Sequence, residues 1–159
     1  MKKPAVLLLV FVLCFCVFSG CSDKEQWVTH TYEDLTVSLP ADFIDLSNAD
    51  FATDLTFLYG LEPICVNGLR EEKAAFAAHG LELTLQQYGE LILLSNNVER
   101  LLQQRDGIWT FSYEAAGYTY VVTLWETEGA FWTVQAYCPT TDYGDVEDQM
   151  WKILCSVTV

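Results

Sequence analysis

The sequence predicts an α+β fold, an antiparallel β-sheet flanked by helices. Three segments between residues 108 and 138 alternate apolar and polar side chains and are joined by short glycine-containing turns, the pattern of an antiparallel meander with one buried face. Two other stretches, one starting at Thr84 and one following Pro139, carry apolar residues at helical spacing. Because strands follow one another instead of alternating with helices, the α+β class is favoured over a parallel α/β sheet.

Residues 1–20 are predicted to be a lipoprotein signal peptide. An uncharged apolar run at residues 5–18 has 14 residues, fewer than the roughly 20 that a membrane-spanning helix needs. The stretch that follows, Phe18-Ser19-Gly20-Cys21, resembles the bacterial lipobox, with Phe18 in place of the usual aliphatic residue. The resemblance implies cleavage before Cys21 and a diacylglyceryl group on its thiol. An ordinary secretory signal with a chance cysteine, or a short uncleaved anchor, are the alternatives.

Lipid attachment at Cys21 would hold the protein at the extracytoplasmic face of the cell membrane. Two or three acyl chains anchor stably, since each buried CH₂ contributes about 0.8 kcal/mol. Residues 21–30 are then the lipidated cysteine and a polar tether, and residues 31–159 form a single globular domain. Cys14 and Cys16 lie inside the signal peptide and would leave with it.

The first strand of the domain is expected at Leu35 to Leu39, where apolar and polar residues alternate up to Pro40. Residues 41–54 mix Asp, Asn and Ser with few apolar residues and predict a loop or a short helix. Two more strands are expected at 56–62 and 64–71, with Pro63 breaking the sheet edge between them or bulging it.

The first helix is predicted to begin at Thr84, because Thr84-Leu85-Gln86-Gln87 is a capping box. Apolar residues continue at helical spacing to Leu94, and Ser95-Asn96-Asn97 ends the helix. A strand at 98–105 is expected before the meander.

The meander strands are predicted at 109–113, 118–125 and 132–138, with turns at Ala116-Gly117 and at 126–129. A last helix is expected from Thr141 or Asp142, with acidic residues in its first turns, where the helix dipole favours negative charge. Its apolar face is formed by Val146, Met150, Ile153 and Val157.

Several of these stretches resemble the PsbP-like superfamily. Residues 32–43 resemble the strand that opens its domain, and residues 83–88 resemble the start of its mid-chain helix. Residues 131–138 and the helix ending at Ser156-Val157 resemble its last strand and closing helix. The resemblance covers roughly residues 28–159 in the same order. It implies an α-β-α sandwich, no shared catalytic residues, and a role in binding or stabilising other proteins.

The formal net charge of −14 argues against direct binding to nucleic acid. All 22 acidic residues follow Cys21, and two of the eight basic residues, Lys2 and Lys3, would leave with the signal peptide, so residues 21–159 carry −16. That charge repels phosphates and anionic lipid. A basic partner, metal cations or simple solubility are all compatible with it.

No residue is assigned a catalytic role, and no metal or cofactor is expected. The two histidines, His30 and His79, lack neighbouring ligand or nucleophile patterns and are interpreted as surface residues. No G-x-S-x-G, H-E-x-x-H, P-loop or G-x-G-x-x-G segment occurs. The acids between Asp142 and Asp148 lack the spacing of a calcium loop and fit a helix start better.

The predicted domain contains three cysteines, Cys65, Cys138 and Cys155. A helix of about 13 residues separates Cys138 from Cys155 by about 20 Å, beyond the roughly 7 Å limit for bridged Cα atoms. Either a disulfide involves Cys65, or all three are buried free thiols. The sheet is expected to be rich in aromatic rings that pack mainly in the core, contributed by the tyrosines and by Trp109, Trp125, Trp132 and Trp151. Any of these rings that is exposed would form a binding patch for protein or glycan.

Together these observations predict a lipid-anchored, non-catalytic binding or scaffolding module of the bacterial cell envelope. Its expected partners are the membrane, through the Cys21 lipid, and another envelope protein. Three alternatives are an envelope-stress or immunity lipoprotein acting against a toxin or phage, a small-ligand carrier, and an enzyme that uses carboxylates alone. An exposed aromatic surface would favour a protein partner, a closed polar pocket a ligand, and two facing carboxylates an enzyme.

Overall fold

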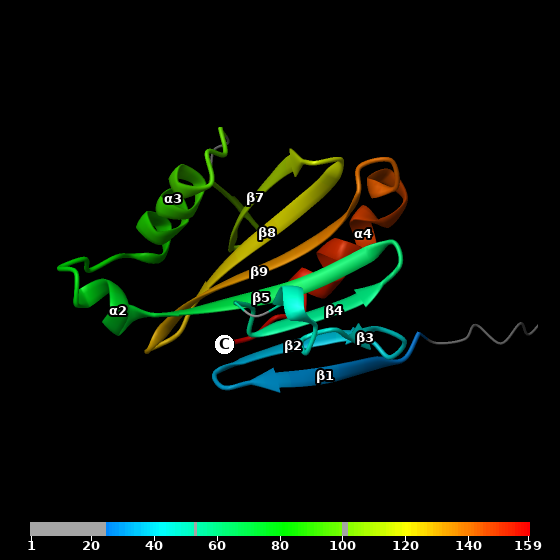
Figure 1. Ribbon diagram of the computed structural model, residues 1–159, viewed down its shortest axis with the longest axis horizontal. Helices are drawn as coiled ribbons and strands as arrows, with labels where there is room; N and C mark the ends of the chain where they lie inside the picture. The colour runs from blue at the N-terminus through cyan, green and yellow to red at the C-terminus, as the bar shows by residue number, and fades with distance from the viewer. Residues whose placement is uncertain (1–24, 53, 100–101) are drawn as a thin grey trace, which may run out of the picture.

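A computed structural model of the chain describes residues 25–52, 54–99 and 102–159 (Figure 1). Its main element is a seven-stranded antiparallel sheet, accompanied by a two-stranded sheet. The strand order of the large sheet is β3 (Ile44–Asp45), β4 (Phe57–Leu61), β5 (Ile64–Glu72), β9 (Ala130–Pro139), β8 (Tyr118–Glu126), β7 (Ile108–Ala115) and β6 (Gln103–Arg105). The small sheet pairs β1 (Trp27–Tyr32) with β2 (Leu35–Pro40). The predicted signal peptide and Cys21 lie outside the described residues. Within the described part, none of the helices has the length and apolar character needed to cross a membrane.

The predicted meander is confirmed as β7 (Ile108–Ala115), β8 (Tyr118–Glu126) and β9 (Ala130–Pro139). The two-residue turn at Ala116 and Gly117 has positive φ at both positions, 52° and 83°, the geometry that matches the twist of a hairpin. Glycine adopts this conformation without strain at the second position. The turn therefore fixes which residues of β7 and β8 face each other.

The strands predicted near residues 56–71 are also confirmed, as β4 (Phe57–Leu61) and β5 (Ile64–Glu72). Pro63 lies in the two-residue connection between them. β5 pairs with β9 from Cys65 to Glu72, so the long β5–β9 ladder joins the two halves of the sheet. The predicted loop at 41–54 contains the short strand β3 (Ile44–Asp45) and a 3₁₀ turn, η1 (Asp50–Ala52).

The mid-chain helix is α3 (Leu85–Ser95), and its predicted capping box is present. The Gln87 backbone N–H donates to the Thr84 hydroxyl at 3.2 Å, and the Thr84 N–H donates to the Gln87 side chain at 2.9 Å. The strand expected at 98–105 is wrong in extent, since only β6 (Gln103–Arg105) is a strand among its described residues. A five-residue helix, α2 (Lys73–Ala77), was not predicted.

The last helix is α4 (Tyr143–Cys155), which begins after Asp142. The prediction that Val157 continues its apolar face is wrong, because the helix ends two residues earlier. Val157 is nevertheless buried, since the chain after α4 returns to β2 and Thr158 bridges to Thr36.

The proposed tether boundary at residue 30 is also wrong. Residues from Trp27 onward form β1 (Trp27–Tyr32), which pairs along its whole length with β2 (Leu35–Pro40). Glu25 is already held to α4 through Lys152 at 3.0 Å, and Lys152 lies over the Trp27 ring. The folded domain therefore includes Glu25, because the hairpin supplies the hydrogen bonds that an isolated polar stretch would lack.

The sheet separates two cores, which confirms the predicted arrangement of helices on both faces. On one face, α4 and the β1-β2 hairpin pack against the residues around Trp132, Val134 and Ala136. On the other face, α3 covers Val122, Leu124 and Phe131. Successive residues of β8 and β9 point to opposite faces of the sheet. Because each face borders one of the two cores, both faces of these strands are apolar.

Candidate functional site

Three tyrosines form a row on the face of the sheet that α3 covers, near the turn that joins β7 and β8. Tyr113, Tyr120 and Tyr137 are direct cross-strand neighbours on β7, β8 and β9. Their rings are stacked, with centroids 4.8 Å apart between the first two and 5.1 Å between the last two. All three side chains are half-buried. We call these three residues the tyrosine row.

In the described part of the chain, α3 covers the sheet beside the tyrosine row, and its C-terminal end at Asn96 lines a cavity together with Tyr113. Figure 1 shows α3 beside the left part of the sheet, away from the turn that joins β7 and β8. Tyr118, next to that turn, is 42% exposed and lies edge-on against Tyr137. The fold thus leaves a group of aromatic side chains in contact with solvent, where large apolar groups gather mainly at binding surfaces.

The phenols of the tyrosine row are neutral at physiological pH. Partial burial raises the pKa of Tyr113, Tyr120 and Tyr137, and the neighbouring tyrosines raise it further. The nearby Cys65 thiol adds to the shift at Tyr137. Each hydroxyl can therefore both donate and accept a hydrogen bond while its ring supplies apolar contact area. Such a surface suits recognition and carries no charge of its own.

The cavity has a volume of about 190 Å³ and is lined by Tyr113 of the tyrosine row and by Ile92 and Asn96 from the end of α3. Asn67 on β5 and Gln135 on β9 are paired in register and also line it. Asn67 is only 6% exposed. Among the described residues no Asp, Glu, Lys, Arg or His lines this cavity, so its polar groups are neutral carboxamides and hydroxyls.

A second hollow, of about 580 Å³, adjoins this cavity. The two share Asn96, Val98 and Tyr113 among their lining residues. The second hollow adds Glu99 and Glu114, which are both exposed. Tyr113 therefore joins the tyrosine row to a groove whose inner part is lined by carboxamides and apolar side chains and whose outer end is acidic.

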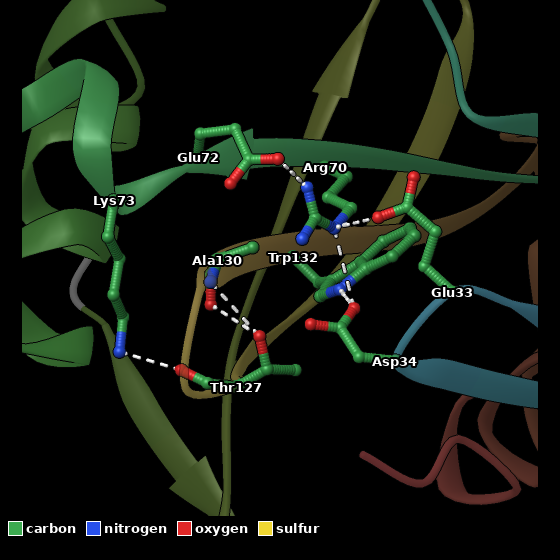
Figure 2. Close-up of polar contacts among 8 residues, drawn as sticks. All are labelled: Glu33, Asp34, Arg70, Glu72, Lys73, Thr127, Ala130 and Trp132. Carbon is green, nitrogen blue, oxygen red and sulfur yellow. Dashed lines mark hydrogen bonds and ion pairs between the residues drawn. The ribbon is translucent and has the colours of Figure 1, made fainter.

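A different cluster of charged residues surrounds Arg70 on the opposite face of the sheet (Figure 2). The Arg70 guanidinium pairs with Glu33 at 3.0 Å, with Asp34 at 3.4 Å and with Glu72. The Trp132 indole donates to Asp34 at 2.9 Å. Because Glu33 and Asp34 form the turn between β1 and β2, these contacts hold the hairpin to the sheet. We interpret this cluster as structural.

The contacts of Asp34 in the Arg70 cluster predict how the free energy of unfolding changes at acid pH. The Thr127 hydroxyl, the Trp132 indole and Arg70 hold the pKa of Asp34 below its ordinary value, against a smaller opposite effect of burial. A lowered folded-state pKa stabilises the protein above the unfolded value of about 3.9 and ceases to do so as the pH falls through the folded value. We expect urea unfolding at pH 5, 4, 3 and 2 to show a stability difference between the native chain and Asp34→Asn that shrinks steadily. A difference that stays constant over this range would contradict the role of Asp34.

The interpretation of His30 as a surface residue of a tether is wrong, whereas His79 is exposed as predicted. His30 lies on β1, and its Nδ1 is 3.1 Å from the Tyr59 hydroxyl oxygen. The Tyr32 hydroxyl donates to the same oxygen at 2.8 Å. Burial, followed by the Tyr59 contact, raises the pKa of Tyr32. This chain of hydrogen bonds ties β1 to β4.

The three cysteines of the domain are free thiols in the described structure. Cys138 is buried and Cys65 partly buried, but Cys155 is exposed, so the expectation that all three free thiols would be buried is wrong. The acids at the start of α4 lie where the helix dipole favours them, with Asp142 as the N-cap residue. No group of three or more potential metal ligands occurs in residues 25–52, 54–99 and 102–159.

The tryptophans pack into the two cores as predicted: Trp132 is fully buried, and Trp109, Trp125 and Trp151 are partly buried against them. The exposed aromatic surface is made of tyrosines, which the sequence prediction grouped with the tryptophans without distinguishing which rings would be exposed. A signal for it was present, since a two-residue turn at 116–117 places Tyr113 opposite Tyr120. The pairing with Tyr137 follows in the same way from the turn between β8 and β9.

The chain is similar in fold to a protein of known structure. No family model matches the chain, and no curated protein sequence matches it. The solution structure of cyanobacterial PsbP (CyanoP) from Synechocystis sp. PCC 6803 superimposes with a TM-score of 0.58 at 11% identity, covering 84% of this chain and 91% of that one. The predicted PsbP-like fold, a large antiparallel sheet with helices, is therefore confirmed.

Proposed function

We propose that this protein is a lipid-anchored, extracytoplasmic binding or scaffolding module of the bacterial cell envelope, without catalytic activity, and that it binds another protein through the tyrosine row. The observation that carries the proposal is the stack of Tyr113, Tyr120 and Tyr137 beside the exposed Tyr118, at the end of the sheet that α3 leaves open. Aromatic side chains that gather at a protein surface in this way mark sites of interaction with other molecules.

Tyrosine suits protein recognition for a physical reason. Its side chain contributes a large apolar area and a polar tip but has few rotatable bonds, so little conformational entropy is lost on binding. In the tyrosine row the stacked neighbours already restrict the rings, which lowers that loss further. The surface is thus preorganised for a partner.

The anchor in this proposal is the lipid on Cys21. Cys21 lies four residues before Glu25, which α4 holds through Lys152. Four residues span at most about 14 Å, so the lipid would keep this end of the domain close to the membrane surface. A module held there meets membrane-bound partners at high effective concentration.

Site-specific photo-crosslinking in cells tests the proposal. A photoreactive phenylalanine analogue is placed at Tyr118 and, as the matched control, at the exposed Asp148 on α4. We expect Tyr118 to yield a discrete crosslinked protein that the control position does not yield. Fractionation with Cys21→Ser should move the protein out of the membrane fraction.

Two results would overturn the proposal. Equal crosslinking from both positions, or none from Tyr118, would remove the role of the tyrosine row. A native chain that carries no lipid and fractionates like Cys21→Ser would remove the anchor.

A further inference from the structure

We infer that the partner contributes an extended, positively charged peptide segment, which lies in the groove beside the tyrosine row. Its backbone would bond to the carboxamides of Asn67 and Gln135, and its basic side chains would reach Glu99 and Glu114. This inference rests on the proposed function, because it names the chemistry of the partner that the tyrosine row binds.

The inner cavity provides groups that match a peptide backbone. Asn67 and Gln135 are register partners on adjacent strands, so their Cα atoms lie about 5 Å apart. Each carboxamide offers both donors and an acceptor, the same pair of functions that a peptide group presents. The hydroxyl of Thr133, also at this cavity, is already bonded to Tyr88 at 2.8 Å. The Asn96 side-chain amide, also at this cavity, already donates to the Ile92 carbonyl oxygen at 2.9 Å. The carboxamides of Asn67 and Gln135 are therefore the principal polar groups for an incoming chain.

The size of the space favours a segment over an enclosed small molecule. Pockets for drug-sized ligands usually measure about 300–1,000 Å³ and bury most of the ligand. The inner cavity of about 190 Å³ is smaller, yet it opens toward the hollow of about 580 Å³ through shared lining residues. An elongated chain can occupy both spaces, entering the inner cavity with one or two residues.

Charge selects a basic segment. Glu99 and Glu114 line the outer hollow, and neither hollow is lined by a Lys or Arg among the described residues. The −16 charge of residues 21–159 adds a long-range attraction for cations. Complementary charge speeds association and excludes acidic competitors.

A neutral oligosaccharide fits this groove less well than a peptide. Sugars bind proteins largely by packing against exposed aromatic faces, whereas the rings of the tyrosine row are stacked on one another, with Tyr113 and Tyr120 only 7° from parallel. A neutral sugar would also gain nothing from the acidic end. The observations therefore favour the peptide.

Selection from a random dodecapeptide library on the full chain in detergent tests the inference. We expect the recovered peptides to be enriched in Lys and Arg, and their affinity to fall as sodium chloride rises from 50 to 500 mM. In the double variant Glu99→Gln/Glu114→Gln the affinity should drop about tenfold and the preference for basic residues should vanish. The matched control, Asp145→Asn/Asp148→Asn on α4, removes the same charge and should keep the preference.

Substitution of the carboxamides tests the backbone contacts. Gln135→Met, at a partly exposed position, should weaken the selected peptides about tenfold, and Asn67→Leu should do the same provided that its circular dichroism spectrum is native. Asn48→Leu, in an exposed loop, is the control.

Three outcomes would overturn the inference. They are peptides without basic enrichment, affinities that Glu99→Gln/Glu114→Gln and Gln135→Met leave unchanged, and displacement of the peptides by chitotetraose, which would indicate a glycan site. Crosslinking of a protein from Tyr118 combined with any of these would leave the proposed function standing and reject only the basic peptide. Loss of Tyr118 crosslinking would reject both.

Discussion

Replacing Trp132 by alanine is expected to lower the free energy of unfolding by about 4 kcal/mol, the largest effect of any single truncation we predict. Trp132 is fully buried on the central strand β9, where it packs in the core beneath α4 and the β1-β2 hairpin. Truncation would leave a cavity that the surrounding strands cannot close, because their backbone ladder is fixed. It would also remove the indole N–H that donates to Asp34.

Urea unfolding followed by circular dichroism measures this effect. Trp132→Phe separates the contribution of apolar packing from that of the hydrogen bond to Asp34, because phenylalanine keeps most of the apolar volume but has no N–H. We expect this variant to lose about 2 kcal/mol of stability. Leu94→Ala is the control, because Leu94 is 75% exposed and should change stability by less than about 0.5 kcal/mol. A cost for Trp132→Ala no greater than that of Leu94→Ala would contradict the assigned packing.

Replacing Gly68 by alanine is expected to cost about 3 kcal/mol, an unusually large effect for one added methyl group. Gly68 on β5 is paired in register with Phe57 on β4. A Cβ atom at Gly68 would lie 2.2 Å from Cε1 of the Phe57 ring, well inside van der Waals contact. The Phe57 ring cannot move freely because it is fully buried and stacked on Tyr32.

A double-mutant cycle tests that explanation. In a Phe57→Leu background the added methyl group should cost at least about 1 kcal/mol less than in the native chain, because the shorter side chain leaves room for it. Gly144→Ala in the first turn of α4 is the matched control, since no atom outside the neighbouring residues of the helix lies within 4 Å of an added Cβ and alanine favours the helix. Equal costs of Gly68→Ala in both backgrounds would rule out the clash with Phe57.

Local patterns predicted the elements that local interactions stabilise. The capping box at Thr84 depends on residues three apart, and the β7–β8 hairpin depends on a two-residue turn, so both are visible in a short window of sequence. The failures occurred where stability comes from distant residues. β1 is polar on much of its surface, and Tyr59 contacts the strand itself, Lys152 the residue Glu25 before it, and Arg70 the turn after it. These three residues lie far along the chain.

The candidate site divides in the same way. The cross-strand pairing of the meander tyrosines can be predicted from the two turns that set the register. Alternation alone, however, suggested only that one face of the meander is buried. The inner cavity was not predictable, because Asn67 and Gln135 are 68 positions apart and meet only through the β5–β9 pairing. Nor does the sequence pattern show that α3 ends before it covers this part of the sheet.

The sequence by itself determined the α+β class, the meander with its turns, the two long helices and the acidic character of the protein, because these follow from periodicity, capping and composition within short stretches. Only the tertiary structure decided that residues 25–30 belong to the domain, that Arg70 holds the hairpin, and that a groove lined by Tyr113 stays open beside α3. Those features depend on which distant surfaces bury each other, and that choice is a property of the whole packed chain.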